Sequence, residues 1–121
     1  MPKIIEHFKH KAPILKLGNI EVSRDFSDVR WISEAYTNLL SIPTKGITRI
    51  NLCSGKLTSI REIIEALQKI TGHQIDIETD LDLVRKVDIQ SQYGKNKKLF
   101  NVVPNLSPTI ELSETLKWML E

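Results

Sequence analysis

The sequence predicts an α/β (α+β) domain in which three to four helices accompany a small mixed sheet. Two observations predict this class. Stretches with a 3.6-residue apolar period alternate along the chain with short extended stretches, and the extended stretches are too few for a large sheet. With 121 residues, 40% of them hydrophobic and 26% charged, the chain has the size and composition of one globular domain spanning 1-121.

The first third of the chain contains one weak and one strong helical pattern. Residues 2–10 predict an amphipathic helix that ends before Pro13, and residues 14–17 read as an extended piece closed by Gly18 and Asn19. Residues 20–26 alternate loosely, as in a strand or extended loop. Residues 28–42 predict a helix with Ser27 or Asp28 as its N-cap, which stops at Pro43. Its apolar side chains are Val29, Ile32, Ala35, Tyr36, Leu39 and Leu40.

The middle of the chain carries the clearest boundary signals. Residues 47–53 read as a strand that breaks at Ser54 and Gly55. Ser59 and Glu62 have the spacing of a capping box, and Gly72 stands where a left-handed residue closes a helix. Residues 74–79 alternate as a half-buried strand, and 80–84 form a loop. We expect 87–93 to be extended, 95–102 to form a short helix and 111–121 to form the last helix.

Composition excludes several classes of protein and site. A net charge of +2 predicts no nucleic-acid partner, and no apolar run reaches the ~18 residues that cross a bilayer, so we expect no membrane contact. The N-terminus lacks a secretory apolar region, which predicts a cytoplasmic location. Cys53 is the single cysteine, and the His7 and His10 pair has no third ligand nearby, so we expect no disulfide and no metal site.

The residues show no catalytic motif. The five glycines are isolated, which excludes a glycine-rich phosphate loop, and no nucleophile elbow is present. Cys53, on the 47–53 strand, reads as a small buried hydrophobe. We therefore expect no catalytic residue and no cofactor bound by this chain.

Two arginines in extended segments are the remaining candidates for a site. Arg24 and Arg85 each have a carboxylate close in sequence, Asp25 and Asp88. A guanidinium matches two phosphate oxygens at once, so two converging arginines would form a diphosphate clamp. Equally, each arginine could pair with its carboxylate and fix its own loop. From the residues alone, both interpretations stay open.

Four short motifs occur along the chain in the order found in one enzyme family. Residues 17–30 resemble an LGN-x-x-x-x-RDF-x-DVRD run. Residues 50–55 and 59–63 resemble a YN(V/I)CSG strand end and the helix start that follows it, and residues 85–88 with 96–99 resemble an RP-x-D…D-x-SKL pattern. Together they resemble the extended short-chain dehydrogenases/reductases of the NAD-dependent epimerase/dehydratase family. The nearest branch contains GDP-mannose 4,6-dehydratase and GDP-4-keto-6-deoxy-mannose reductase.

The resemblance implies the C-terminal, nucleotide-sugar-binding part of a Rossmann-type enzyme that lacks its N-terminal dinucleotide-binding domain. It implies an excised, truncated or remnant chain without the Tyr-x-x-x-Lys pair, not catalytic alone, with NAD(P) expected in the full-length enzyme. The implied ligand is a nucleotide-diphosphate sugar, a GDP-sugar favoured, and the parent reaction oxidises a hexose hydroxyl before dehydration, epimerisation or reduction.

Carried over by position, the resemblance implies substrate-binding roles for Arg24, Arg85, Asp88 and Asn19. Four positions depart from the pattern, and they leave the sugar nucleotide open: Trp31, Lys86, Lys97 and the 103–108 segment. The alternative is a non-catalytic oligomerisation or interaction module derived from the same fold. An exposed face of Val29, Ile32 and Tyr36, or an exposed 47–53 strand, predicts a homodimer or swapped oligomer.

Overall fold

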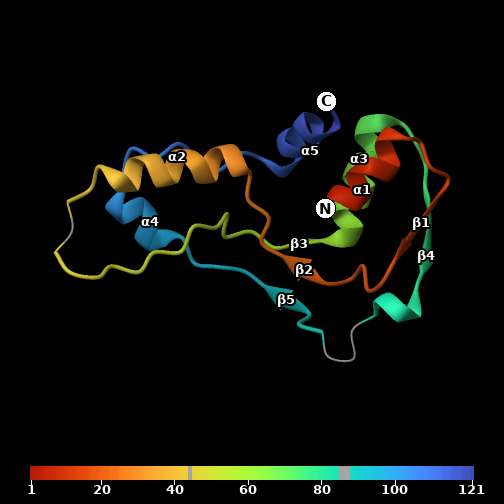
Figure 1. Ribbon diagram of the computed structural model, residues 1–121, viewed down its shortest axis with the longest axis horizontal. Helices are drawn as coiled ribbons and strands as arrows, with labels where there is room; N and C mark the ends of the chain where they lie inside the picture. Colours follow the sequence, from red (N-terminus) through yellow and green to blue (C-terminus); the bar gives the residue numbers. More distant parts are fainter. Residues whose placement is uncertain (44, 85–87) are drawn as a thin grey trace.

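The computed structural model describes residues 1–43, 45–84 and 88–121. These residues form five α-helices, one 3₁₀ turn and two small sheets. The mixed α/β class is confirmed, although the described helices number five instead of three or four. Figure 1 shows an elongated molecule with a group of helices toward each end, the three-stranded sheet between the groups, and the two-stranded sheet along the outer edge of one group.

The first lobe contains helices α1 (Pro2–Lys9), α3 (Ile60–Thr71) and α5 (Leu112–Leu120), beside strands β1 (Ile14–Leu17) and β4 (Asp76–Thr79). β1 and β4 pair in parallel, with Leu15 opposite Ile77. The helices and strands enclose one core, formed by Ile4, Ile5, Phe8, Leu15, Ile63, Ile64, Leu67, Ile75 and Leu116.

Helix α3 forms as its boundary residues predict. The Ser59 hydroxyl accepts a hydrogen bond from the Glu62 N–H, and the Glu62 carboxylate accepts one from the Ser59 N–H, which completes the capping box. At the other end Gly72 has a φ of 68°, a left-handed conformation that glycine adopts without steric cost.

The second lobe contains helices α2 (Val29–Leu40) and α4 (Lys97–Val102) with the irregular segments around them. Its core is smaller and consists of Trp31, Ala35, Leu99, Val103 and Leu106. Trp31 is 1% exposed, and its indole N–H donates to the Ser107 carbonyl at 2.9 Å. The buried face of α2 therefore runs through Trp31 and Ala35, while the expected apolar positions Val29, Tyr36 and Leu40 are exposed.

A three-stranded mixed sheet joins the lobes. Strand β2 (Ser23–Arg24) lies between β3 (Thr58–Ser59), which is antiparallel to it, and β5 (Ser91–Gln92), which is parallel to it. A second link runs from α2 to α5. Asp28 is 3% exposed and accepts a hydrogen bond from the Thr115 hydroxyl at 2.7 Å, and the Arg30 guanidinium lies 4.5 Å from the centre of the Trp118 ring.

The predicted strand at 47–53 is wrong for this structure. The segment has no regular element, because no segment within residues 1–43, 45–84 and 88–121 pairs with it as a strand ladder requires. The 3₁₀ turn η1 (Leu81–Leu83) occupies the loop expected at 80–84. The extended piece predicted at 14–17 is strand β1 with the same bounds, and the remaining predicted elements are present but shortened at one or both ends.

Candidate functional site

A shallow cleft of about 300 Å³ lies beside strand β2, where the linking sheet meets the second lobe. The parallel pairing of β2 with β5 brings Arg24 opposite Gln92, two positions that are far apart in the sequence. Polar groups from three separate segments surround the cleft: Arg24, Asp25, Asn51, Gln92, Tyr93 and Gly94.

Arg24 forms an ion pair with Asp88 across the linking sheet. The Arg24 Nη2 atom donates to the Asp88 Oδ1 atom at 3.2 Å, and Nη1 donates to the Ser23 carbonyl at 2.9 Å. The side chains are 27% and 15% exposed, so the pair is only partly screened by water. Of the two interpretations of Arg24, carboxylate pairing is therefore present, but the partner is Asp88 and not the adjacent Asp25.

Asp25 connects the loops that form the floor of this cleft. Its carboxylate accepts hydrogen bonds from the Ser54 N–H at 2.9 Å, the Ser54 hydroxyl at 2.5 Å and the Gly55 N–H at 2.9 Å. The Gly94 N–H adds a fourth at 3.3 Å. Burial would raise the pKa of the Asp25 carboxyl, but these donors together hold that pKa below its ordinary value. Asp25 is therefore ionised, and it fixes the backbone around Arg24.

Cys53 lies under the same floor and is not suited to be a nucleophile. Its side chain is buried, and burial, followed by the nearby Asp25 charge, raises the pKa of the thiol. A side chain at Gly94 would collide with the Cys53 sulfur, so the loop needs a glycine there. These contacts match the interpretation of Cys53 as a small buried hydrophobe.

The four predicted site residues are not gathered in one place. Arg24 and Asp88 are in contact. Asn19 lies elsewhere: its Oδ1 atom accepts from the Glu21 N–H at 2.9 Å, and it lines a different cavity of about 310 Å³ with Glu21, Arg61 and Val84. Arg85 lies outside the described residues. The convergence of Arg24 and Arg85 therefore stays a prediction.

The sequence analysis did not predict two further groups of residues that shape the site. Asp25 appeared only as a neighbour of Arg24, although its short carboxylate holds three loops together. Gln92 and Tyr93 reach the cleft through strand pairing, for which the sequence carried no local signal. Asp28 was expected as a helix cap, and the structure adds its contacts with Arg30 and Thr115.

Two classes of site are absent from the described residues. Residues 1–43, 45–84 and 88–121 contain no cluster of three His, Cys, Asp or Glu side chains that could hold a metal ion. Within the same part of the chain, no helix combines the length and the apolar character needed to span a bilayer.

Comparison with known proteins shows which enzymes the chain is similar to. It is 34% identical over 110 residues to GDP-6-deoxy-D-mannose reductase of Pseudomonas aeruginosa, which is 91% of this chain and 36% of the reductase. The structure of a Burkholderia cenocepacia J2315 protein assigned as an epimerase matches with a TM-score of 0.92 and 40% identity, over 98% of this chain and 39% of that protein. No family model matches the sequence.

A third match includes a cofactor complex. The structure of RMD from Pseudomonas aeruginosa complexed with NADPH has a TM-score of 0.83 at 32% identity, and the match covers 98% of this chain and 39% of RMD. The chain thus spans little more than a third of the length of each of these relatives. The matches lie in the C-terminal part of the relatives, which confirms the resemblance inferred from the motifs.

Proposed function

Because the chain corresponds to the C-terminal part of extended short-chain dehydrogenases/reductases, we propose that it is a domain that binds a nucleotide-diphosphate sugar. A GDP-sugar is the favoured ligand, since the Pseudomonas relative is named as a GDP-6-deoxy-D-mannose reductase. Arg24, Arg85, Asp88 and Asn19 are the proposed substrate-binding residues.

The observation that carries this proposal is the position of Arg24 in the cleft. Two of its five guanidinium N–H groups are used by Ser23 and Asp88, and the others have no partner among the described residues. A diphosphate can accept hydrogen bonds from them, as guanidinium groups readily bind phosphate oxygens. Asp88 then acts as a positioning residue, because it holds the guanidinium at the edge of β2.

Asp25 contributes to binding without touching the ligand. Its hydrogen bonds fix the loops at Ser54 and Gly94 before any ligand arrives. A cleft that is ordered in advance loses less entropy on binding than one that must form around its ligand.

The proposed role in a reaction is binding and orientation. The chain has no glycine-rich turn between a strand and a helix, so its residues do not fit a dinucleotide, and we place NAD(P) on the remaining part of a full-length enzyme. There the cofactor supplies hydride transfer. This chain would hold the diphosphate so that the sugar is correctly oriented, which can lower a reaction barrier substantially.

Titration of the chain with GDP-, UDP- and dTDP-sugars tests the proposal. Arg24→Ala and Arg85→Ala should each weaken binding by about 1.5–3 kcal/mol, and Arg24→Lys should recover only part of the loss because an ammonium lacks the fork. Lys69→Ala, an exposed charge removal on α3, is the control. If both alanine variants bind like the parent chain, the clamp does not exist.

A second candidate function, self-association, rests on the outer surface of α2. Val29 and Tyr36 are 58% and 61% exposed, while Ile32 is partly buried against the core of the second lobe. Exposed apolar side chains on one helix favour contact with another surface. On this alternative the chain forms a homodimer or swapped oligomer, and a monomeric sedimentation profile at high concentration would contradict it.

A further inference from the structure

Acidic and basic side chains are unevenly distributed between the two lobes. The stretches 35–61 and 89–110, which form most of the second lobe, contain no Asp or Glu. Of their basic residues, Lys56 and Arg61 have carboxylate partners. The other five form no ion pair in the described part of the chain, and we refer to them as the basic strip: Lys45, Arg49, Lys95, Lys97 and Lys98.

The basic strip leads away from the cleft beside strand β2. Asn51 and Gly94 both line that cleft. The Asn51 side-chain amide donates to the Lys95 carbonyl at 3.4 Å, which joins the two segments at the edge of the cleft. Further out, Lys98 Nζ donates to the Arg49 carbonyl at 2.8 Å. The two segments therefore run side by side, and the basic side chains they carry continue from the cleft along the second lobe.

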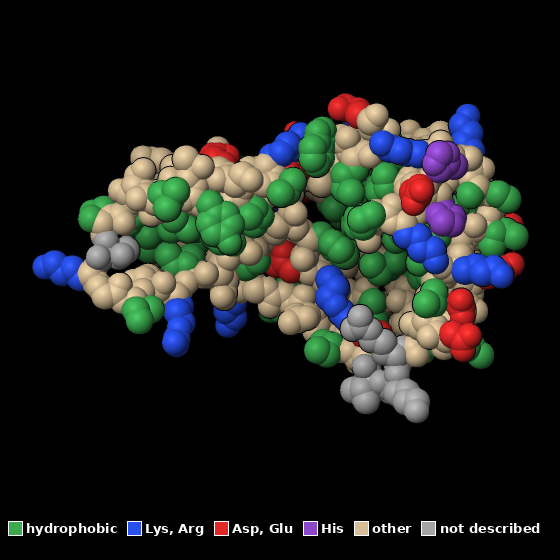
Figure 2. All heavy atoms as spheres, viewed as in Figure 1, with side chains coloured by type: hydrophobic (Ala, Val, Ile, Leu, Met, Phe, Trp, Pro, Cys, Tyr) green, Lys and Arg blue, Asp and Glu red, His purple; other side chains and the backbone are tan. Residues whose placement is uncertain are grey.

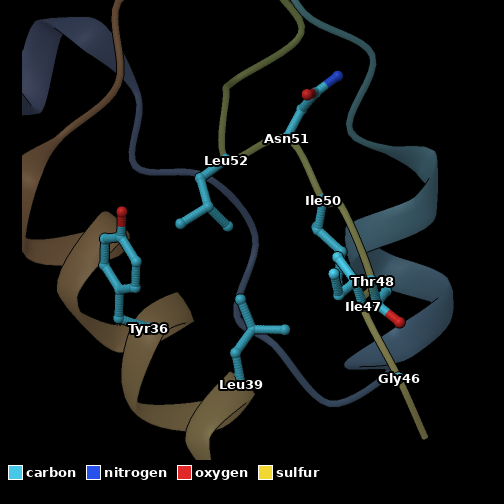
Figure 3. Close-up of a pocket in the computed structure, with 8 residues that line it drawn as sticks. All are labelled: Tyr36, Leu39, Gly46, Ile47, Thr48, Ile50, Asn51 and Leu52. Carbon is cyan, nitrogen blue, oxygen red and sulfur yellow. The ribbon is translucent and has the colours of Figure 1, made fainter. Parts of the chain in front are cut away.

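All five residues of the basic strip are exposed to water. Figure 2 shows Lys and Arg side chains projecting from the lower edge and the tip of the second lobe. Figure 3 shows Asn51 and Leu52 pointing in opposite directions, with Leu52 directed toward Tyr36 and Leu39. The apolar side of this segment thus faces α2, and its polar side, through Asn51, belongs to the cleft.

The position of the strip favours a small anionic ligand over a macromolecule. Single-stranded nucleic acid is held by aromatic side chains interleaved with positive charges, and neither 45–49 nor 94–98 contains an aromatic residue. The strip instead ends at a cleft in which the Arg24 guanidinium has N–H groups without a partner among the described residues. A diphosphate suits both features, because it is small and it accepts hydrogen bonds from a guanidinium.

We propose that the basic strip guides the diphosphate of a nucleotide sugar into the cleft that holds Arg24. Its charges act on an approaching anion over a Debye length, ~8 Å at physiological ionic strength, so they attract the ligand before any contact forms. The strip therefore increases the rate of association, whereas Arg24 holds the bound ligand. This inference rests on the proposed function and adds to it the direction from which the substrate enters.

One charge of the strip distinguishes this chain from the family pattern. The D-x-SKL part of that pattern has Ser immediately before the Lys that corresponds to Lys98, and this chain has Lys97 there. Lys97→Ser, the change back to the pattern, should therefore slow association about two-fold at low ionic strength.

Association of the chain with GDP-mannose is measured at two ionic strengths, from NMR line shapes of the amides in the cleft. At about 0.01 M salt, where charges act over ~30 Å, Lys95→Gln/Lys97→Gln should lower the association rate constant about five-fold and leave the dissociation rate constant unchanged. At about 1 M salt, where the range is ~3 Å, the double variant and the parent chain should associate equally fast.

A double variant on the first lobe is matched in net charge. Lys9→Gln/Lys69→Gln removes two exposed positive charges from α1 and α3, and it should change the association rate constant by less than about two-fold. An equal effect of the two double variants would overturn the inference, because net charge and not the strip would then set the rate. Lys95→Arg/Lys97→Arg keeps both charges and should associate like the parent chain, and slow association of this variant, with circular dichroism showing that it folds, would also overturn the inference.

The two rate constants separate this inference from the proposed function. If Arg24→Ala weakens binding through faster dissociation while Lys95→Gln/Lys97→Gln leaves both rate constants unchanged, the proposed function stands and the basic strip has no role in it. If the parent chain binds no nucleotide sugar, both the proposed function and this inference fail.

A single DNA strand of about ten nucleotides tests the other class of anion. At equal phosphate concentration it should not displace GDP-mannose from the chain, because the strip lacks side chains on which bases stack. Displacement would assign the basic strip to nucleic acid and overturn the inference.

Discussion

The two lobes differ in how completely they are closed. In the first lobe, nine buried residues lie among three helices and the pair of strands β1 and β4. In the second, five buried residues lie between two helices and irregular chain, with Leu40 and Ile47 87% and 93% exposed. The first lobe therefore buries most of its apolar side chains within its own core, whereas the second leaves large apolar side chains exposed on α2 and on the 47–53 segment.

The largest expected effect comes from Trp31→Ala in the second lobe. Trp31 is 1% exposed, so the substitution should cost about 3–5 kcal/mol of stability. We expect α2 and α4 to lose protection in hydrogen exchange while α1 and α3 keep theirs. Equal loss of protection in both lobes would show that they unfold as one unit.

Leu67→Ala makes the matching change in the first lobe. Leu67 is fully buried on α3, and its truncation should lower the free energy of unfolding by about 2–5 kcal/mol. Denaturant unfolding with hydrogen exchange should show both lobes losing protection, since the second lobe depends on the first for its sheet and for Thr115. Selective loss in the first lobe would contradict this dependence.

Substitution of Asp28 tests the coupling between the lobes. Its carboxylate caps α2, binds the Arg30 guanidinium at 2.7 Å and accepts from Thr115 on α5. Asp28→Asn should therefore cost about 1–3 kcal/mol, with Glu6→Gln as an exposed control. A double-mutant cycle with Thr115→Val should show interaction between the two sites. Strict additivity would mean that this contact does not couple the lobes.

The smallest effect is a dependence of stability on acid pH. The pKa of Asp28 is lowered from 3.8, first because Arg30 hydrogen-bonds its carboxylate, so the folded state binds a proton less readily than the unfolded state. The stabilisation is present above the ordinary pKa and is lost as the pH falls below it. Denaturant midpoints measured between neutral pH and pH ~2 should fall, and Asp28→Asn should flatten that decline.

Local signals predicted the first lobe well. Ser59, Glu62 and Gly72 specify α3 through contacts within a few residues, and the structure contains each of them. The alternation of Ile75 and Ile77 likewise indicated a strand that β1 pairs. Such elements are predictable because the residues that determine them are neighbours in the sequence.

Long-range contacts explain what could not be predicted. Arg24 pairs with Asp88, 64 positions away, although Asp25 is adjacent. Asp25 instead collects donors that lie 29 to 69 positions along the chain. The strand pattern at 47–53 depends on a ladder partner, and no pattern within the segment states whether that partner is present.

The separation of charge has an electrical consequence. The basic residues around 45–49 and 95–98 lie at one end of an elongated molecule, and the acidic run Asp76, Glu78, Asp80 and Asp82 lies at the other, where Lys16 pairs with Glu78, so a net charge of +2 conceals an uneven distribution of charge. At low ionic strength it should be retained on both cation- and anion-exchange resins, each resin holding a different end.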